Sequence, residues 1–328
     1  MRKIYLILLV LILFIIGCSG GSQSSANVGP DRTPFRGGDI GLSMEFLDGS
    51  PPDEIFDNKN YPFGIVVQLE NLGEDEVEVG DGFIRVTGIN PVDFGLSGQS
   101  DLERPIPAME GVKKNFDGTI VDGDQDNVEF PGLNYQLDLP GNILQPRIRA
   151  EACYNYKTRT ATLICIKPDL LAKTETKEVC DIAEDKEAQN SGGPLQITEF
   201  TQQAISSDKI QVSFVVSHVG APNDRFFKLG TDCDDRVTNV DKEKVLVTVT
   251  SDVNGAIPKC TGLQESNAAG NSGFITLFDR VDRTVVCEID ISAIDSTFEE
   301  LFEVDLEYRY FNFIEESVLI KDVGGSNP

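Results

Sequence analysis

Apolar and polar residues alternate with a period of two over much of the chain, which is the pattern of strands that bury one face. The clearest stretch is 302–310, where every second residue is apolar or aromatic. In the first half, the predicted strands cover 40–46, 63–70, 76–86, 127–137, 147–156 and 162–166. In the second half, they cover 195–200, 209–217, 244–250, 273–278, 284–291, 302–310 and 318–320. The sequence therefore predicts an all-β protein.

The two halves of the chain resemble each other, which indicates an internal duplication. The tyrosine-bearing segments 154–156 and 308–310 align without a gap, and a weaker match aligns Asn71 with His218. Each half is long enough to close a β-sandwich of its own. We therefore expect two tandem β-sandwich domains, over 39–168 and 195–326, with a linker over 169–194.

The N-terminus has the pattern of a lipoprotein signal peptide. Two basic residues precede the apolar run Ile4–Ile16, which ends just before a glycine and Cys18. The run has 13 residues, whereas a membrane-spanning helix needs roughly 20. We expect cleavage after 1–17, lipid on Cys18, and a flexible Ser/Gly-rich tether over 18–38. The alternatives are a short signal anchor or an ordinary secretory signal with an incidental cysteine.

The charge of the chain narrows the choice of partners. The 328 residues carry a formal net charge of −26. A field of this sign repels phosphate backbones and anionic lipid headgroups, so the composition disfavours nucleic acid as a partner. The expected contact with the membrane is the lipid on Cys18, on the outer face of the cell membrane. Other surface proteins or glycans are the remaining partner classes.

Six cysteines follow Cys18, which is an even number in a chain expected to reach an oxidising exterior. Such a set predicts three disulfides. The chain has one histidine and no CxxC pair, which disfavours a zinc site. The six residues are Cys153, Cys165, Cys180, Cys233, Cys260 and Cys287.

The predicted strands 147–156 and 162–166 suggest a hairpin, and this hairpin suggests one pairing. With a turn centred on Arg159, Cys153 would lie opposite Cys165, at a distance that a disulfide can span. The other four cysteines allow three connectivities. For these we favour Cys260 with Cys287 and Cys180 with Cys233, the latter restraining the hinge between the two sandwiches.

The segment 67–73, Val-Gln-Leu-Glu-Asn-Leu-Gly, resembles the second strand and turn of immunoglobulin-like domains of the CARDB kind. These domains occur in tandem on archaeal and bacterial surface proteins. Together with the lipoprotein-like N-terminus, the chain resembles surface lipoproteins with paired immunoglobulin-like domains. The resemblance implies two tandem immunoglobulin-like β-sandwiches but no functional site. The chain departs from antibody-type domains in having no tryptophan.

An acidic loop is the candidate metal site. Asp122, Asp124 and Asp126 place oxygen donors at alternate positions, and Ca²⁺ prefers such ligands. The twelfth position of this loop is Leu133, where an EF-hand needs a glutamate. A solvated acidic turn is the alternative interpretation. A weaker group of the same kind surrounds Cys233: Asp232, Asp234 and Asp235.

The sequence contains no recognisable catalytic motif. His218 follows a predicted strand and reads as a turn residue, and no GxSxG motif is present. We therefore predict a structural, adhesion or protein-interaction module without enzymatic activity, and no cofactor other than a structural Ca²⁺ at the acidic loop. The alternative is a carbohydrate- or calcium-binding accessory protein. Four tyrosines offer a sugar-stacking platform, although their alternation with apolar residues favours the core: Tyr154, Tyr156, Tyr308 and Tyr310.

Overall fold

The computed structural model describes residues 33–323, except for 60, 140, 171–178 and 184–185. The predicted signal peptide, Cys18, most of the tether and part of the linker lie outside the described residues. The described chain consists of strands and loops with three short 3-10 helices, which confirms the all-β prediction. No helix in the described part is long and apolar enough to cross a membrane. The 3-10 helices are η1 (Pro91–Phe94), η2 (Gln99–Leu102) and η3 (Phe278–Arg280).

Six strands of the first half form two layers. They are β1 (Leu42–Phe46), β3 (Phe63–Asn71), β4 (Gly82–Thr87), β5 (Glu103–Pro105), β8 (Gln125–Leu133) and β10 (Arg147–Ile166). One sheet has the order β1-β3-β8, and β10, β4 and β5 are neighbours in the other. In β3, Ile65, Val67 and Leu69 are fully buried, because β-branched and aliphatic side chains at every second position fill the space between sheets.

The second half repeats this arrangement. Its main strands are β12 (Leu195–Ala204), β13 (Lys209–His218), β15 (Lys244–Ser251), β16 (Lys259–Thr261), β17 (Ser272–Thr276), β18 (Arg283–Asp290) and β19 (Phe298–Ser317). One sheet has the order β12-β13-β18-β16, and β17, β15 and β19 are neighbours in the other. The short strands are β2 (Glu54–Phe56), β6 (Lys113–Lys114), β7 (Ile120–Val121), β9 (Ile143–Leu144), β11 (Gln189–Asn190), β14 (Arg225–Phe227) and β20 (Leu319–Lys321).

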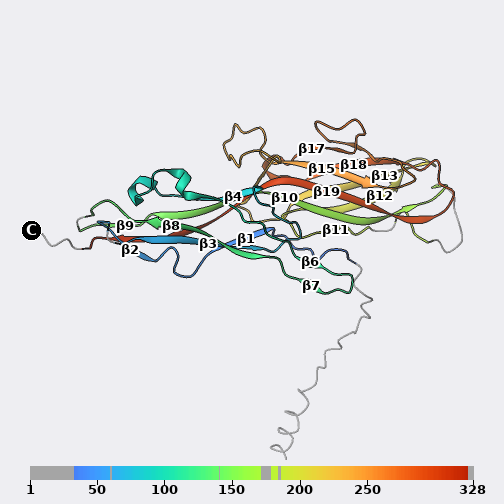
Figure 1. Cartoon of the computed structure of the whole chain (residues 1–328). Helices are drawn as coiled ribbons and strands as arrows, with labels where there is room; N and C mark the ends of the chain where they lie inside the picture. The colour runs from blue at the N-terminus through green and yellow to red at the C-terminus, as the bar shows by residue number, and fades with distance from the viewer. Residues whose placement is uncertain (1–32, 60, 140, 171–178, 184–185, 324–328) are drawn as a thin grey trace, which may run out of the picture. The chain divides into compact units, whose positions relative to one another are not determined.

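The two halves share one sheet. β10 and β19 pair antiparallel over all 20 residues of each strand and run side by side in Figure 1. The shared sheet has the strand order β17-β15-β19-β10-β4-β5. Contacts group the described residues into one compact unit. The strand order of each half agrees with a sandwich, whereas the prediction of two separate immunoglobulin-like sandwiches is not confirmed.

The predicted hairpin at Arg159 is wrong, because 147–166 is a single strand. Inward-facing residues continue in phase past Arg159, and Thr158 and Thr160 are buried with them. The segment 157–160 contains no glycine, proline, asparagine or aspartate, the residues that favour turns.

The pairing of β10 with β19 has a local twofold symmetry. The sequence repeat aligns Tyr154 with Tyr308, whereas the strand register pairs Tyr154 with Tyr310 and Tyr156 with Tyr308. A twofold axis that passes between the paired residues Asn155 and Arg309 would therefore superpose β10 on β19 and β19 on β10. The remaining strands follow the same exchange, with β1-β3-β8 corresponding to β12-β13-β18.

The four tyrosines lie in the core where the halves meet. Each is at most 2% exposed, so a sugar-stacking platform built from them is wrong. Their hydroxyl groups bond to the strands around them. In the first half, the Leu42 N–H donates to the Tyr154 hydroxyl at 3.0 Å. In the second half, the Leu195 backbone forms a hydrogen bond with the Tyr308 hydroxyl. The Asn312 amide donates to the Leu42 carbonyl at 3.0 Å, which links the halves directly.

Three disulfides are present, as predicted from the even cysteine count, and they indicate an oxidising, extracytoplasmic environment. The favoured pair Cys260–Cys287 is confirmed. The pairs Cys153–Cys165 and Cys180–Cys233 are wrong. On one extended strand, two residues twelve positions apart lie roughly 40 Å from each other, too far for a disulfide. The other two bonds are Cys153–Cys233 and Cys165–Cys180.

Candidate functional site

The outer face of the shared sheet carries a row of aromatic and arginine side chains. Alternate residues of β10 and β19 face away from the buried tyrosines. On this face the strand register places Cys153 beside Phe83 of β4 on one side and Phe311 of β19 on the other. Phe311 in turn pairs with Arg225 of β14. The fold therefore aligns residues from four strands that are far apart in the sequence.

The neighbouring row alternates charge with aromatic rings. Glu151 lies between Arg85 of β4 and Phe313 of β19. The guanidinium group of Arg149 lies 4.1 Å from the centre of the Phe313 ring, and that of Arg85 lies 4.5 Å from the Phe83 ring. These are cation–π distances. The rows thus form a mixed surface of half-buried rings and guanidinium groups.

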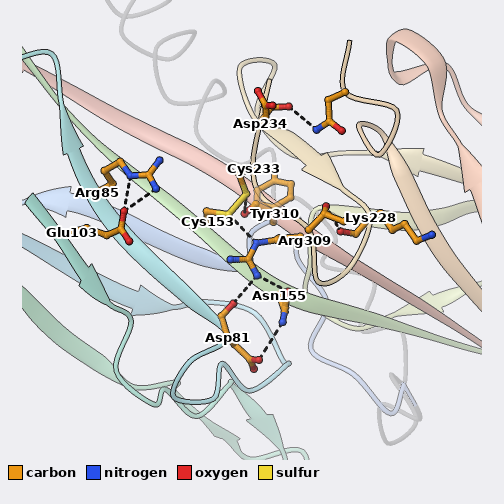
Figure 2. Close-up of a disulfide and its surroundings, with 12 residues drawn as sticks. Asp81, Arg85, Glu103, Cys153, Asn155, Lys228, Cys233, Asp234, Arg309 and Tyr310 are labelled. Carbon is orange, nitrogen blue, oxygen red and sulfur yellow. Dashed lines mark hydrogen bonds and ion pairs between the residues drawn. A yellow bond between two sulfur atoms is a disulfide. The ribbon is translucent and has the colours of Figure 1, made fainter. Parts of the chain in front are cut away.

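The bond between Cys153 and Cys233 fixes a loop over this face (Figure 2). This loop connects β14 to β15 and carries the acidic group predicted around Cys233. Asp234 accepts hydrogen bonds from Arg236, which hold the pKa of that carboxyl below its usual range. Asp235 forms ion pairs with Arg225 at 3.5 Å and Lys242 at 2.5 Å. Basic side chains therefore already neutralise these two carboxylates.

Two hollows lie beside the disulfide. One, of about 370 Å³, is lined by the Phe311 and Phe313 rings together with Arg149 and Glu151. The other, of about 380 Å³, is lined by Phe83, Arg85 and the acidic loop. Cys233 and Asp235 line both, so the two hollows adjoin at the loop. The sequence suggested only the acidic group around Cys233, because the other residues of this site come together through strand pairing.

Arg309 lies next to the disulfide, at the local twofold centre. Its Nε donates to Cys153 Sγ at 3.0 Å, and its Nη1 donates to the Asn155 amide oxygen at 3.0 Å (Figure 2). Nη1 also donates to the Asp81 carbonyl at 3.4 Å. Burial lowers the pKa of Arg309, but an arginine keeps its charge in proteins. The Arg309 guanidinium group therefore helps to hold the Cys153–Cys233 disulfide in position.

A second polar cluster lies at one end of the buried tyrosines. The Tyr310 hydroxyl donates to Asp224 Oδ2 at 2.7 Å and lies 3.2 Å from His218 Nε2. Burial, with the nearby positive Arg280 and Arg225, lowers the pKa of His218 to about 4, so the imidazole is neutral at pH 7. Burial raises the pKa of Asp224. His218 is thus a half-buried, neutral imidazole that stacks on the ring of Phe226.

The first half has a corresponding cluster. Asn71 is aligned with His218, and its amide donates to the Asp75 carbonyl at 2.8 Å. The Asp75 N–H donates to the Tyr156 hydroxyl at 3.4 Å. Burial is the main reason that the pKa of the Asp75 carboxyl rises to about 6. Each half therefore places a carboxyl of raised pKa beside its second core tyrosine.

The structure does not bring the predicted calcium ligands together. Asp122, Asp124 and Asp126 are exposed, and Asp124 accepts a hydrogen bond from the Glu110 N–H. Among the described residues, the group of three carboxylates with oxygen atoms within 4.8 Å of one another is Asp57, Asp138 and Asp322.

In that group, Asp57 is buried and its carboxylate accepts backbone hydrogen bonds from Leu139 and Val323. Carboxylate oxygens suit a hard cation, but no second feature of the described residues points to an ion, and we assign none. Calcium binding by Asp122, Asp124 and Asp126 stays a prediction.

Comparison with known proteins gives no family for this chain. No family model matches it, and no curated protein matches it. One similar solved structure is the secreted serine protease VesC from Vibrio cholerae, with 8% sequence identity and a TM-score of 0.17. The match covers 84% of this chain and 51% of that chain, so this chain spans about half the length of the protease.

The serine protease match stands against the sequence-based prediction that the chain is not an enzyme, and we withdraw that prediction. A TM-score of 0.17 is also too low to support an inference of protease activity or of a shared fold. The resemblance to CARDB-like domains stays an expectation from the sequence, because neither comparison identifies such domains.

Proposed function

We propose that the protein is a cell-surface module of the structural, adhesion or protein-interaction class. In this proposal, residues 1–17 are a cleaved lipoprotein signal peptide and the lipid on Cys18 holds the protein at the outer face of the cell membrane. The tether 18–38 and the two immunoglobulin-like halves complete the arrangement. The three disulfides support it, because they suit an oxidising exterior.

The observation that carries the surface role is the bracing of one broad face. The 20-residue pairing of β10 with β19 and the bond Cys153–Cys233 hold both halves to one sheet. A fixed face of half-buried rings and charged groups is suited to recognition, because little conformational entropy is lost when a partner binds. Surface proteins or glycans are the partner classes that remain, because the negative charge of the chain disfavours nucleic acid.

The test of this proposal is the membrane address. Replacing Cys18 with Ser removes the thiol that would be lipidated, so the variant should move from the membrane fraction to the medium or accumulate as precursor. In intact cells, an impermeant biotin reagent should label the wild-type protein. Unchanged fractionation and processing of the Cys18→Ser variant, or protection of the wild type from the reagent, would contradict the proposal.

A further inference from the structure

We propose that the outer face of the shared sheet binds a neutral glycan across the two hollows beside Cys153–Cys233. The inference rests on the proposed surface role and names the ligand class of its recognition face. Phe311 and Phe313 line one hollow and Phe83 lines the other. The C–H faces of sugar rings pack on aromatic rings, which give large contact areas at little entropic cost.

Sugar hydroxyl groups both donate and accept hydrogen bonds, and the first hollow offers partners of both kinds. Arg149 and Arg225 are donors, Glu151 and Asp235 are acceptors, and the exposed Asn223 side chain is both. Small-molecule sites characteristically combine aromatic walls with a few fixed polar groups of this sort. The lining therefore matches the chemistry of a carbohydrate.

The charges in this hollow favour an uncharged ligand. Arg225 lies 3.5 Å from Asp235, and Arg149 lies 3.8 Å from Glu151. The two positive guanidinium groups and the two negative carboxylates that line the first hollow therefore cancel each other's charge. An anionic ligand would approach the carboxylates, and the chain as a whole would repel it at a net charge of −26. A cationic ligand would meet the guanidinium groups.

The site is held in place before any ligand binds. The disulfide anchors the loop at Cys233, and Lys242 fixes Asp235 at 2.5 Å. The Asn239 amide donates to the Asp234 carbonyl at 2.7 Å, which closes the loop on itself. Fixed contacts of this kind reduce the entropy that binding would otherwise cost.

The dimensions and polarity favour a glycan chain over a protein. Hollows of about 370 and 380 Å³ fall in the range of small-ligand sites. Because they adjoin at Cys233, several sugar units in a row can contact both. The centre of a protein–protein interface is depleted of charged residues, whereas charged side chains line the centre of this face.

The test is binding of the full-length Cys18→Ser protein to immobilised β-1,3-glucan, β-1,4-glucan, α-mannan and β-galactan, with heparin as the anionic comparison. We expect saturable binding to at least one neutral glycan. In titrations with that glycan, Phe313→Ala and Asn223→Ala should each weaken affinity at least tenfold. Asn223 is exposed, so its replacement tests the site without disturbing the core. Phe116→Ala, at a fully exposed ring outside this face, should bind like the parent.

Three results would overturn the inference: binding to none of the four neutral glycans, unchanged affinity in both face variants, or stronger binding to heparin. Capture of a protein partner through this face without glycan binding would overturn it as well. In each case, biotin labelling of intact cells still reports separately on the proposed surface role. If the wild type is not labelled, the proposed function fails whatever the glycan result.

Discussion

Burial beside the core tyrosines raises the pKa of two carboxyl groups, Asp75 and Asp224. Asp75 is the clearer case, because its pKa rises to about 6. Burial penalises the charged form, and the nearby cations Arg159 and Lys157 only partly offset that penalty. At pH 7 the folded protein therefore carries an ionised group in an unfavourable environment.

Asp75→Asn should stabilise the protein at pH 7 by about 3 kcal/mol, because folding raises the pKa of the Asp75 carboxyl from 3.8 to about 6. The raised pKa means that the folded state keeps its proton at a pH where the unfolded state has lost it. Below about pH 4, the wild type and the variant should therefore have similar free energies of unfolding. As the pH rises through about 6, the wild type should lose stability relative to the variant.

Urea unfolding of wild type and variant from pH 3.5 to 7.5 checks this prediction. The gain should vanish at the acidic end and be complete above pH 7. Asp295→Asn, at an exposed carboxyl group, serves as the control for the loss of one negative charge. A variant less stable than wild type at pH 7 would show that the carboxylate charge at Asp75 is needed for folding.

At the scale of the strand, one long element was predicted as two. The alternation of 147–166 fits a single strand as well as a hairpin, and only the absence of turn residues around Arg159 distinguished them. The partner strand, 298–317, lies more than a hundred residues away, so no local signal reveals it. The incorrect pair Cys153–Cys165 followed from the incorrect hairpin, because the predicted hairpin register was the only argument for that pair.

Other elements were predictable because their own pattern decides them. The strand predicted over 63–70 is β3 (Phe63–Asn71), and that predicted over 284–291 is β18 (Arg283–Asp290). The predicted strand 76–86 is shorter, starting at Gly82. The rows of the outer face could not be predicted from the sequence. Phe83, Cys153 and Phe311 are far apart in the chain, and only strand pairing places them side by side.

Removing the bond between the halves should destabilise the protein strongly. Cys153 and Cys233 are 80 positions apart. Closing a loop of that length lowers the entropy of the unfolded chain and so destabilises the unfolded state by about 4.5 kcal/mol. Cys153→Ser with Cys233→Ser should therefore lower the urea midpoint more than the matched control, Cys260→Ser with Cys287→Ser. The control bond spans 27 positions and lies within the second half. Equal losses in the two double variants would contradict the prediction.

For the whole molecule, the two halves should stay together after the chain between them is cut. The pairing of β10 with β19 satisfies the edges of both strands, and an unpaired edge of 20 residues would be left if they separated. We expect a protein cleaved at a protease site inserted in 171–178 to elute as one particle.

The cleaved protein must be reduced first, because Cys165–Cys180 and Cys153–Cys233 would otherwise join the fragments. Size-exclusion chromatography under native reducing conditions should give one peak that contains both fragments, and only denaturant should separate them. The uncut, reduced chain is the control for effects of reduction alone. Two separate folded fragments would show that the strand pairing does not hold the halves together.

The twofold exchange about Asn155 and Arg309 has the geometry of an isologous contact in a homodimer, here built into one chain. Association of the halves is therefore independent of protein concentration. Each position of the contact also occurs only once and can diverge from its counterpart. Cys153 has its bridge on one side of the axis, whereas the aligned residue in the other half is Glu307. A true homodimer would be obliged to repeat that bridge, together with the hollows beside it, on both sides.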